Sequence, residues 1–581
     1  MSPRHLAIMS SGLAARGIHY ALLTLVWAVL CLPNLGGPSL WDIDEGNNAQ
    51  AAREMYESGN VIVPTFNYKL RVDKPILLYW LQVSAYHVCG VNEFAARLPS
   101  ALAALLAILV TYELGRRLFG QSAGLLAGLV LASNVAFCGA AHFANPDALL
   151  NLCTVLTLWC FWNHYRSEGG WWLLGCGVAS GLGMLAKGPV GLLLPMAVTT
   201  LFLLWRGELR RLCDLRMLGA SVMFLAIAAP WYIWVGLETK GEWLIGFFWK
   251  HNVQRAVDAM ENHGGPFYYY ILVLIVGLTP WSVFLGPTVW HALSAFRFPL
   301  SALRSPWSAL RNRSLIWSKA DSGQRTADSG KQFLLCWLGV WFVFFTVVRT
   351  KLPNYILPAY PAVALLTAAF LDDWRRGQIT LPAWVMPTSL TCLALIGVGV
   401  SLGLLIAGNA ISVDALRGRC LPGLEKGAWL GGVFLIGAAV AGWCMRRRWR
   451  GGLIGCVAMV GVIFAGTIAF WGTGVVDRFK APRSLVQALP EDHTRREVRV
   501  AAFDYFQPSL VFYCQREVHC PQNDYFAFDF LRTPLPVYLF VSEEKWEQFK
   551  KFAPPSYHLV ARHRDLYNGR EILLVTNETI K

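Results

Sequence analysis

The chain of 581 residues is 55% hydrophobic and only 15% charged, with a net charge of +15 at pH 7. Ordinary soluble domains carry about 25% charged residues, so the composition excludes a soluble protein with one large core. Apolar runs long enough to cross a bilayer recur along the chain, which is typical of a polytopic helical membrane protein. The basic residues form short clusters between these runs, which argues against a nucleic-acid-binding patch.

Hydropathy predicts about 13 spans. They fall near residues 17–35, 97–118, 122–141, 147–165, 171–186, 189–205, 217–236, 267–290, 332–348, 355–371, 383–407, 427–444 and 452–472. With the N-terminus inside, every second loop is rich in arginine, as the positive-inside rule requires. The odd number of spans places the C-terminus outside. We expect a transmembrane domain over residues 1–473 and a soluble periplasmic α/β domain over 474–581.

The C-terminal region alternates between strand and helix patterns. Strands are predicted at 497–503, 537–541, 557–562 and 571–575, and helices at 507–514 and 543–552. Cys514 and Cys520 could form a disulfide in an oxidising compartment. This region lacks a glycine-rich phosphate loop, and its sequence assigns it no chemistry. The long loop at 291–331, predicted inside, looks flexible and also carries no recognisable site.

An acidic stretch opens the first outer loop, residues 37–96. Asp42, Asp44 and Glu45 precede a helical pattern that ends at Ser58-Gly59-Asn60. Asp44 could simply cap this helix, with Glu45 in its first turn. A polar loop of this density in an apolar protein also suggests half of an active site, with Asp44 and Glu45 as catalytic candidates.

Asp147 follows Asn145-Pro146 at the outer end of the fourth predicted span. Proline followed by an acid is ordinary helix-start chemistry. An ionisable residue beside a membrane helix end is equally a functional-site hypothesis. The topology brings Asp147 to the same face as Asp44, where two carboxylates could bind or deprotonate an acceptor group.

Several cations on the outer face are candidates for binding a lipid phosphate. Lys74 precedes Pro75 at a polar-to-apolar boundary, where a lysine can also snorkel to the interface. Lys187, Arg255 and Lys351 could serve the same role from other outer loops. Lysine or arginine would neutralise the phosphate and stabilise it as a leaving group.

Asp73, His251 and His263 offer oxygen and nitrogen ligands for zinc or another divalent ion. Their spacing matches no recognised ligand pattern, and isolated interfacial histidines are usually not ligands. We therefore keep both interpretations of this group open.

Seven motifs lie in order along the membrane region. They are Asp44-Glu45-Gly46, Lys74-Pro75, VNEFAARL at 91–98, Lys187-Gly188-Pro189, HNVQR at 251–255, PFYYY at 266–270 and KLPNYILP at 351–358. Together they resemble the aminoarabinose transferases, which modify lipid A and belong with the protein O-mannosyltransferases to the membrane glycosyltransferase class called GT-C. The resemblance extends to about residue 370 and is weak beyond it.

This resemblance implies an inverting glycosyltransferase that moves a sugar from a polyprenyl-phosphate carrier to an envelope acceptor. The acceptor would be lipid A, another glycolipid or a protein, at the outer face of the bacterial inner membrane. The resemblance makes Asp44 the catalytic carboxylate and Asp147 its supporting acid, with Lys74 and Arg255 contacting the carrier phosphate. It requires no cofactor and leaves room for a metal ion.

Two departures from the family pattern leave the substrate open. Asn47-Asn48 replaces the usual Arg-Tyr after Asp-Glu-Gly, and Asp73 replaces a glutamate before Lys-Pro. An alternative function is a transporter or lipid flippase with acidic outer loops. Such a protein is expected to carry charged residues deep within several spans. The predicted spans are nearly free of acids and show no repeat, which favours the enzyme.

Overall fold

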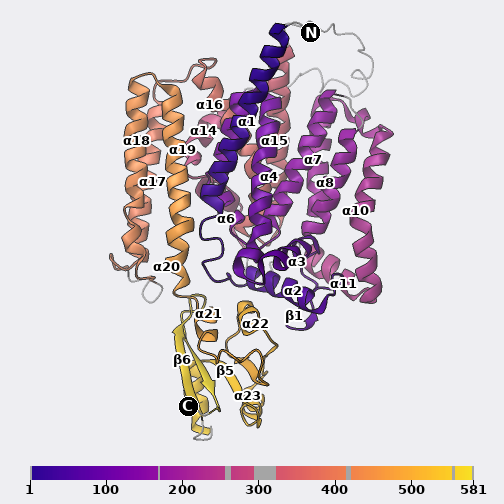
Figure 1. Cartoon of the computed structure of the whole chain (residues 1–581). Helices are drawn as coiled ribbons and strands as arrows, with labels where there is room; N and C mark the ends of the chain where they lie inside the picture. The colour runs from indigo at the N-terminus through magenta and orange to yellow at the C-terminus, as the bar shows by residue number, and fades with distance from the viewer. Residues whose placement is uncertain are drawn as a thin grey trace.

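The structure is a computed structural model that describes residues 3–167, 171–254, 264–293, 322–413, 420–552 and 557–578. A bundle of long helices carries a small sheet domain at one end, joined to the bundle through the first loop and the segment after α19 (Figure 1). We call the bundle end that holds Cys31, Asp147 and Lys187 the domain face. The other end, which holds Arg206 and Arg216, is the opposite face.

The bundle helices coincide with the predicted apolar segments. They are α1 (Pro3–Cys31), α4 (Glu93–Phe119), α5 (Gln121–Ala132), α6 (Val135–Ala141), α7 (Asp147–Ser167), α8 (Trp171–Lys187), α9 (Val190–Arg206), α10 (Arg216–Glu238), α13 (Tyr269–Gly277), α14 (Leu285–Leu293), α15 (Ser322–Val347), α16 (Tyr360–Arg375), α17 (Val385–Ala407), α18 (Leu430–Arg446) and α19 (Arg450–Thr467). A polytopic helical membrane protein is thereby confirmed.

A test of helix length and composition gives fewer membrane spans than the sequence predicted. Among the described residues, 8 helices are long and apolar enough to cross a membrane, or up to 10 if each of two bent pairs is one span. The pairs are α5 with α6, bent by 67°, and α13 with the helical segment 281–293, bent by 115°. The predicted count of about 13 is therefore not confirmed. Most of the 291–331 loop lies outside the described residues.

Close helix crossings position the ends of the bundle helices. A Cβ atom on Gly191 of α9 would lie 2.3 Å from the carbonyl carbon of Gly183 in α8. Only glycine permits this approach, as at other crossings of membrane helices. The turn between α8 and α9 therefore packs tightly and holds Lys187 at the domain face.

Two helices of the first loop lie at the domain face beside the sheet domain (Figure 1). They are α2 (Asp44–Ser58) and α3 (Leu77–Cys89), with a hairpin of β1 (Thr65–Phe66) and β2 (Lys69–Leu70) between them. The helix predicted to end at Ser58-Gly59-Asn60 is confirmed, and its Ala49 and Met55 side chains are buried against Tyr79 and Tyr86. Gly59 ends α2 in the left-handed conformation, which glycine adopts without strain.

The C-terminal domain is a five-stranded mixed sheet in the order β4-β3-β5-β7-β6. The strands are β3 (Arg499–Phe503), β4 (Val518–His519), β5 (Val537–Ser542), β6 (His558–Arg564) and β7 (Glu571–Thr576), with α21 (Ala481–Val486), α22 (Pro508–Cys514), α23 (Asp524–Leu531) and α24 (Glu543–Phe549). The fully buried β5 pairs parallel with β3 and antiparallel with β7. The predicted C-terminal α/β architecture is confirmed, although α21, β4 and α23 were not predicted.

The hairpin of the first loop joins this sheet at its edge. Asn67, at the hairpin tip, accepts a hydrogen bond from the amide of Val518 at 2.9 Å and donates one to its carbonyl at 2.8 Å. The disulfide considered between Cys514 and Cys520 is not formed, because Cys514 is buried at the end of α22 while Cys520 is exposed after β4.

Candidate active site

A cavity of about 660 Å³ lies at the domain face, between the start of α2 and the ends of α6, α7 and α13. Its polar lining residues are Asp42, Asp44, Glu45, Asn145, Asp147 and Asn354. We call it the carboxylate cavity, since four acidic residues from two distant parts of the chain line it. The structure thus brings Asp44 and Asp147 together, as the topology predicted.

Asp44 is the first residue of α2 and is exposed. Ile43 occupies the N-cap position, and no side chain caps the helix, so the capping role considered for Asp44 is not formed. Within the part of the chain that the structure describes, no hydrogen bond or ion pair engages the Asp44 carboxylate. An acid at a helix N-terminus is stabilised in its charged form by the helix dipole. Asp44 is therefore available to a molecule in the cavity.

Glu45 is fully buried, and its carboxylate oxygens already accept four hydrogen bonds. Arg97 donates from Nε at 2.9 Å and from an η nitrogen at 2.8 Å, and the amides of Trp41 and Ala144 donate at 2.8 and 2.6 Å. Four bonds use the whole acceptor capacity of a carboxylate. The catalytic role predicted for Glu45 does not fit this position, because Glu45 instead ties the first loop to α4 and α7.

Arg97 completes this anchor and was not predicted. Its remaining N–H groups donate to the carbonyl oxygens of Leu35, Pro38 and Ser39 at 2.8–2.9 Å. All five guanidinium donors are thus used, and they fix the backbone that leads into α2. The VNEFAARL motif contained this arginine, but its partners are more than 50 residues away.

Asp147 is buried and forms an ion pair with Lys187. Its second carboxylate oxygen accepts a hydrogen bond from the Asn354 amide at 2.7 Å, and the Lys187 ammonium lies 5.0 Å from the ring centroid of Tyr355. Because both oxygens are engaged, Asp147 is held rather than free. Asn354 was part of the KLPNYILP motif but was not predicted as a site residue.

A second cavity, of about 500 Å³, lies on the other side of this ion pair. Lys74, Lys187, Asp73 and His251 line it together with apolar side chains that include Leu193, Phe247, Phe344 and Phe345. We call it the cation groove. Asp147 lines the carboxylate cavity and Lys187 lines the cation groove, so the ion pair lies where the two spaces meet.

Two of the three predicted metal ligands come together in the cation groove. One carboxylate oxygen of Asp73 lies 3.0 Å from Nε2 of His251, and the other lies 3.3 Å from the Arg71 guanidinium. Burial opposes the charged form of Asp73, but the hydrogen bond with His251 and the charges of Arg71 and Lys74 hold its pKa well below its ordinary value. His263 lies outside the described residues, and the described part of the chain contains no cluster of three candidate ligands.

Lys351 does not occupy the predicted phosphate-binding position. Its ammonium donates to the carbonyl oxygens of Thr346 at 2.8 Å and Val348 at 3.1 Å, at the end of α15. It is buried and lines neither cavity. The carbonyl groups left without partners at a helix C-terminus attract such a cation. Arg255, predicted to contact the carrier phosphate, lies outside the described residues.

Asn47-Asn48 stands where the aminoarabinose transferases usually have Arg-Tyr, and the contacts of Asn48 explain the second of these two residues. Asn48 is fully buried, donates to the carbonyl of Ala144 at 3.0 Å and accepts from Arg71 at 3.3 Å. It therefore connects the first loop with the turn before α7, a role that leaves its side chain no access to a substrate.

The C-terminal domain contributes to the carboxylate cavity through Asp42. The amide of Ser509, at the start of α22, donates to Asp42 at 2.8 Å, and the Tyr567 hydroxyl accepts from the Asp42 amide at 2.9 Å. Gly46 permits this contact, since a Cβ there would lie 2.5 Å from the Ser509 nitrogen. Burial raises the pKa of Asp42 to about 7, although the bonds from Ser509 and the charge of Lys480 favour ionisation.

This raised pKa predicts a pH-dependent stability that Asp42→Asn removes. The pKa of an aspartate in an unfolded chain is about 4. Between about pH 4 and pH 7 the folded protein therefore binds more protons than the unfolded protein, and its stability falls as the pH rises. We expect the native chain to lose roughly a few degrees more in melting temperature than Asp42→Asn between these values. Equal slopes in differential scanning fluorimetry of the two proteins would contradict this assignment.

Comparisons with known proteins agree with the motifs. Residues 73–234 match the family model described as dolichyl-phosphate-mannose-protein mannosyltransferase. The undecaprenyl phosphate-alpha-4-amino-4-deoxy-L-arabinose arabinosyl transferase of Erwinia tasmaniensis is 32% identical over 60% of this chain and 59% of its own length. The transferase of the same name from Pseudomonas savastanoi pv. phaseolicola is 30% identical over 65% of this chain and 66% of its own length. The matched region thus spans roughly three fifths of these relatives.

The fold has a close counterpart among solved structures. The crystal structure of ArnT from Cupriavidus metallidurans bound to undecaprenyl phosphate superposes with a TM-score of 0.76 and covers 97% of this chain and 98% of its own, at 24% identity. The same protein in the apo state gives a TM-score of 0.74. This likeness confirms the fold through both the helical bundle and the C-terminal sheet. The chain is therefore similar to the mannosyltransferase family over residues 73–234 and to the arabinosyl transferases over about three fifths of its length, and it shares the fold of ArnT.

Proposed function

We propose that this protein is an inverting glycosyltransferase that moves a sugar from a polyprenyl-phosphate carrier to an envelope acceptor. The observation that carries the proposal is the pair of adjoining spaces, one lined by an unengaged carboxylate and the other by cations on an apolar surface. The Asp147–Lys187 ion pair lies between them. A transferase needs this arrangement, because acceptor activation and leaving-group stabilisation must occur on opposite sides of one sugar.

The cation groove suits the donor. Its aromatic and aliphatic lining offers contact to a polyprenyl tail, and Lys74 and Lys187 offer positive charge to the carrier phosphate. The structure with the same fold binds undecaprenyl phosphate, which supports this assignment. In this arrangement Asp147 orients Lys187, and the charged Asp73–His251–Arg71 cluster supports the loop that carries Lys74.

The reaction would proceed by direct displacement at the anomeric carbon. The acceptor oxygen attacks from the carboxylate cavity while the bond between the anomeric carbon and the phosphate oxygen breaks. The phosphate leaves with the bonding electron pair and is neutralised by the lysines. Asp44 takes the proton of a hydroxyl acceptor. A phosphate acceptor is already nucleophilic and would use Asp44 only for orientation.

The proposal places the reaction at the periplasmic side of a bacterial inner membrane. Arginines gather at the opposite face, at 206–216, 375–376 and 446–450, which is typical of cytoplasmic loops. The domain face, with both cavities and the C-terminal domain, would then lie in the periplasm. We propose residues 1–473 as the transmembrane domain and 474–581 as the periplasmic domain.

The acceptor is an envelope glycolipid or a protein, and the resemblance of the sequence motifs to the aminoarabinose transferases favours lipid A. Mass spectrometry of envelope glycolipids and glycoproteins from cells with and without the gene tests this. We expect one class to lose a sugar in the deletion strain. An unchanged profile in both pools would contradict the enzyme.

The displacement needs no cofactor, and zinc held by Asp73 and His251 stays a prediction. We expect the purified enzyme to retain its activity after dialysis against EDTA. Activity that is lost on chelation and restored by zinc would instead assign a metal to this pair.

Lys74→Gln should weaken use of the donor. Loss of a charge-assisted contact of about 1.5–3 kcal/mol corresponds to roughly 10- to 150-fold in kcat/KM for the polyprenyl donor. The matched control is Lys69→Gln, since Lys69 is exposed on β2 and lines neither cavity. Steady-state kinetics with a polyprenyl-phosphate sugar checks this, and equal kcat/KM values for both variants would remove Lys74 from the donor site.

A further inference from the structure

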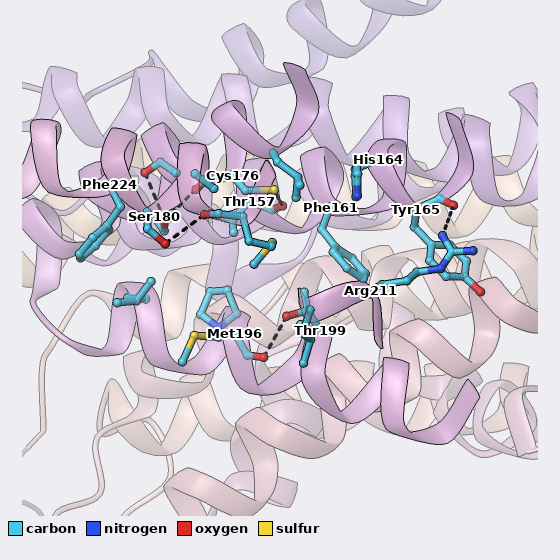
Figure 2. A pocket seen from close by; sticks show the side chains of 18 of the residues that line it. Thr157, Phe161, His164, Tyr165, Cys176, Ser180, Met196, Thr199, Arg211 and Phe224 are labelled. Carbon is cyan, nitrogen blue, oxygen red and sulfur yellow. Dashed lines mark hydrogen bonds between the residues drawn. The ribbon is translucent and has the colours of Figure 1, made fainter. Parts of the chain in front are cut away.

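A third cavity, of about 330 Å³, lies far from the candidate active site, between α7, α8, α9 and α10. On α7, α8 and α10 it occupies the half near the opposite face, while on α9 its lining runs from Leu192 to Leu203. We call it the α7–α10 groove. Figure 2 shows Arg211 and Tyr165 at one end and Ser180 and Phe224 at the other. The proposed glycosyl transfer makes no use of it.

The groove offers no free hydroxyl donor. The hydroxyls of Thr157, Ser180, Thr199 and Ser221 each donate to a carbonyl of their own helix, at 2.7–3.0 Å. Phe161, Leu173, Met196 and Leu225 are among the side chains that supply the remaining, apolar lining. A sugar or nucleotide would lose its hydrogen bonds to water here without replacement. The lining therefore fits a hydrocarbon.

The length of the groove matches one leaflet of a bilayer. Along α10 the lining residues run from Met217 to Leu225, a rise of about 12 Å. Half of a hydrocarbon core is about 15 Å. Met196 and Leu225 are 50% and 56% exposed, so the groove is open sideways, where lipid surrounds a membrane protein. An acyl chain can enter without unfolding the bundle.

The membrane-surface end of the groove is positively charged. The segment 206–216 holds four arginines against two acids. Arg211 lies 4.7 Å from the ring centroid of Tyr165, donates to the Tyr165 carbonyl at 3.1 Å and pairs with Glu208 at 2.8 Å. Its side chain is still 40% exposed. These contacts hold a cation where a phospholipid bound in the groove would place its phosphate.

We propose that the α7–α10 groove is a binding site for one acyl chain of an anionic phospholipid, with the lipid phosphate at Arg211. The bound lipid comes from the leaflet at the opposite face and fills the space between α9 and α10. This site is separate from the cation groove in position and leaflet, and it stands whether or not the proposed transfer is correct.

The test uses the full-length purified protein and phosphatidylglycerol that carries a photoreactive acyl chain. We expect crosslinks to peptides of α9 and α10, and loss of most of them in Ser221→Phe, which narrows the groove. Val222→Phe is the matched control, because Val222 is the next residue of α10, is exposed and does not line the groove. Equal crosslinking in Ser221→Phe and Val222→Phe would overturn the proposal.

The charge is tested with Arg211→Gln and native mass spectrometry. One arginine at a membrane surface contributes about 1 kcal/mol, so phosphatidylglycerol affinity should fall about fivefold. The affinity for phosphatidylethanolamine with the same chains should be nearly unchanged. Inorganic phosphate should not compete with the lipid. Equal affinity of the native protein for both lipids, or displacement by free phosphate, would overturn the assignment of an anionic phospholipid.

Discussion

Asp44→Asn is expected to lower transfer to a hydroxyl acceptor by about 10²- to 10⁴-fold, the range of a general base. The variant keeps the size of the side chain and removes only its charge and basicity. Because no hydrogen bond or ion pair among the described residues engages the Asp44 carboxylate, we expect unchanged membrane insertion and melting temperature. The measurement is kcat/KM with a purified polyprenyl-phosphate sugar and an envelope acceptor.

Glu57→Gln is the control for this experiment. Glu57 lies on the same helix, is partly exposed and pairs only with Arg53 among its described ion pairs, so its loss should leave turnover unchanged. Near-normal turnover by Asp44→Asn would remove Asp44 from catalysis of hydroxyl transfer. It would also revive the transporter or flippase alternative, in which no single carboxylate of this loop performs chemistry.

Arg97→Met is expected to have the largest effect on stability. It leaves Glu45 charged and buried, without its ion-pair partner, and removes the donors to Leu35, Pro38 and Ser39. Breaking a buried pair from one side costs about 3–5 kcal/mol. We expect a large fall in melting temperature and in the yield of folded protein, measured by scanning fluorimetry and size-exclusion chromatography in detergent.

Two variants make this prediction specific to the buried pair. The double variant Glu45→Gln/Arg97→Met removes the uncompensated charge and keeps an acceptor for one of the two amides, Trp41 or Ala144, that bond to different oxygens of Glu45, so it should recover part of the loss. Arg483→Met breaks a partly exposed pair with Glu93 at 3.4 Å and should cost at most about 1 kcal/mol. A double variant less stable than Arg97→Met would show that burial of the Glu45 charge is not the cause.

The sequence predicted the helices well, because apolar periodicity and charge clusters are local signals. Every predicted apolar segment coincides with a helix or a broken pair. The number of spans could not be settled in the same way. Val190–Arg206 has only 17 residues and falls below the length of a full span, while α5 and α6 break at Ser133-Asn134, where the Asn134 side chain caps the second helix.

The candidate site was predicted in part. Asp44 and Asp147 could be placed together because topology alone fixes which helix ends share a face. Glu45 and Lys351 could not be distinguished from them, since their roles depend on burial and on partners such as Arg97 and the end of α15. Asn354 and Ser509 were missed, because an uncharged side chain gives no signal until its contact with an acid is known.

The contact between Asp42 and Ser509 also constrains how the protein is made. Its two residues are separated by 467 positions, and Asn67 meets Val518 across a similar distance of 451. At a synthesis rate of about 5–20 residues per second, the first loop is made roughly half a minute to a minute and a half before its partners exist. The acidic loop therefore lacks its contacts with the C-terminal domain until most of the polypeptide has been made. Formation of the environment of Asp42 is thus a late event of biogenesis.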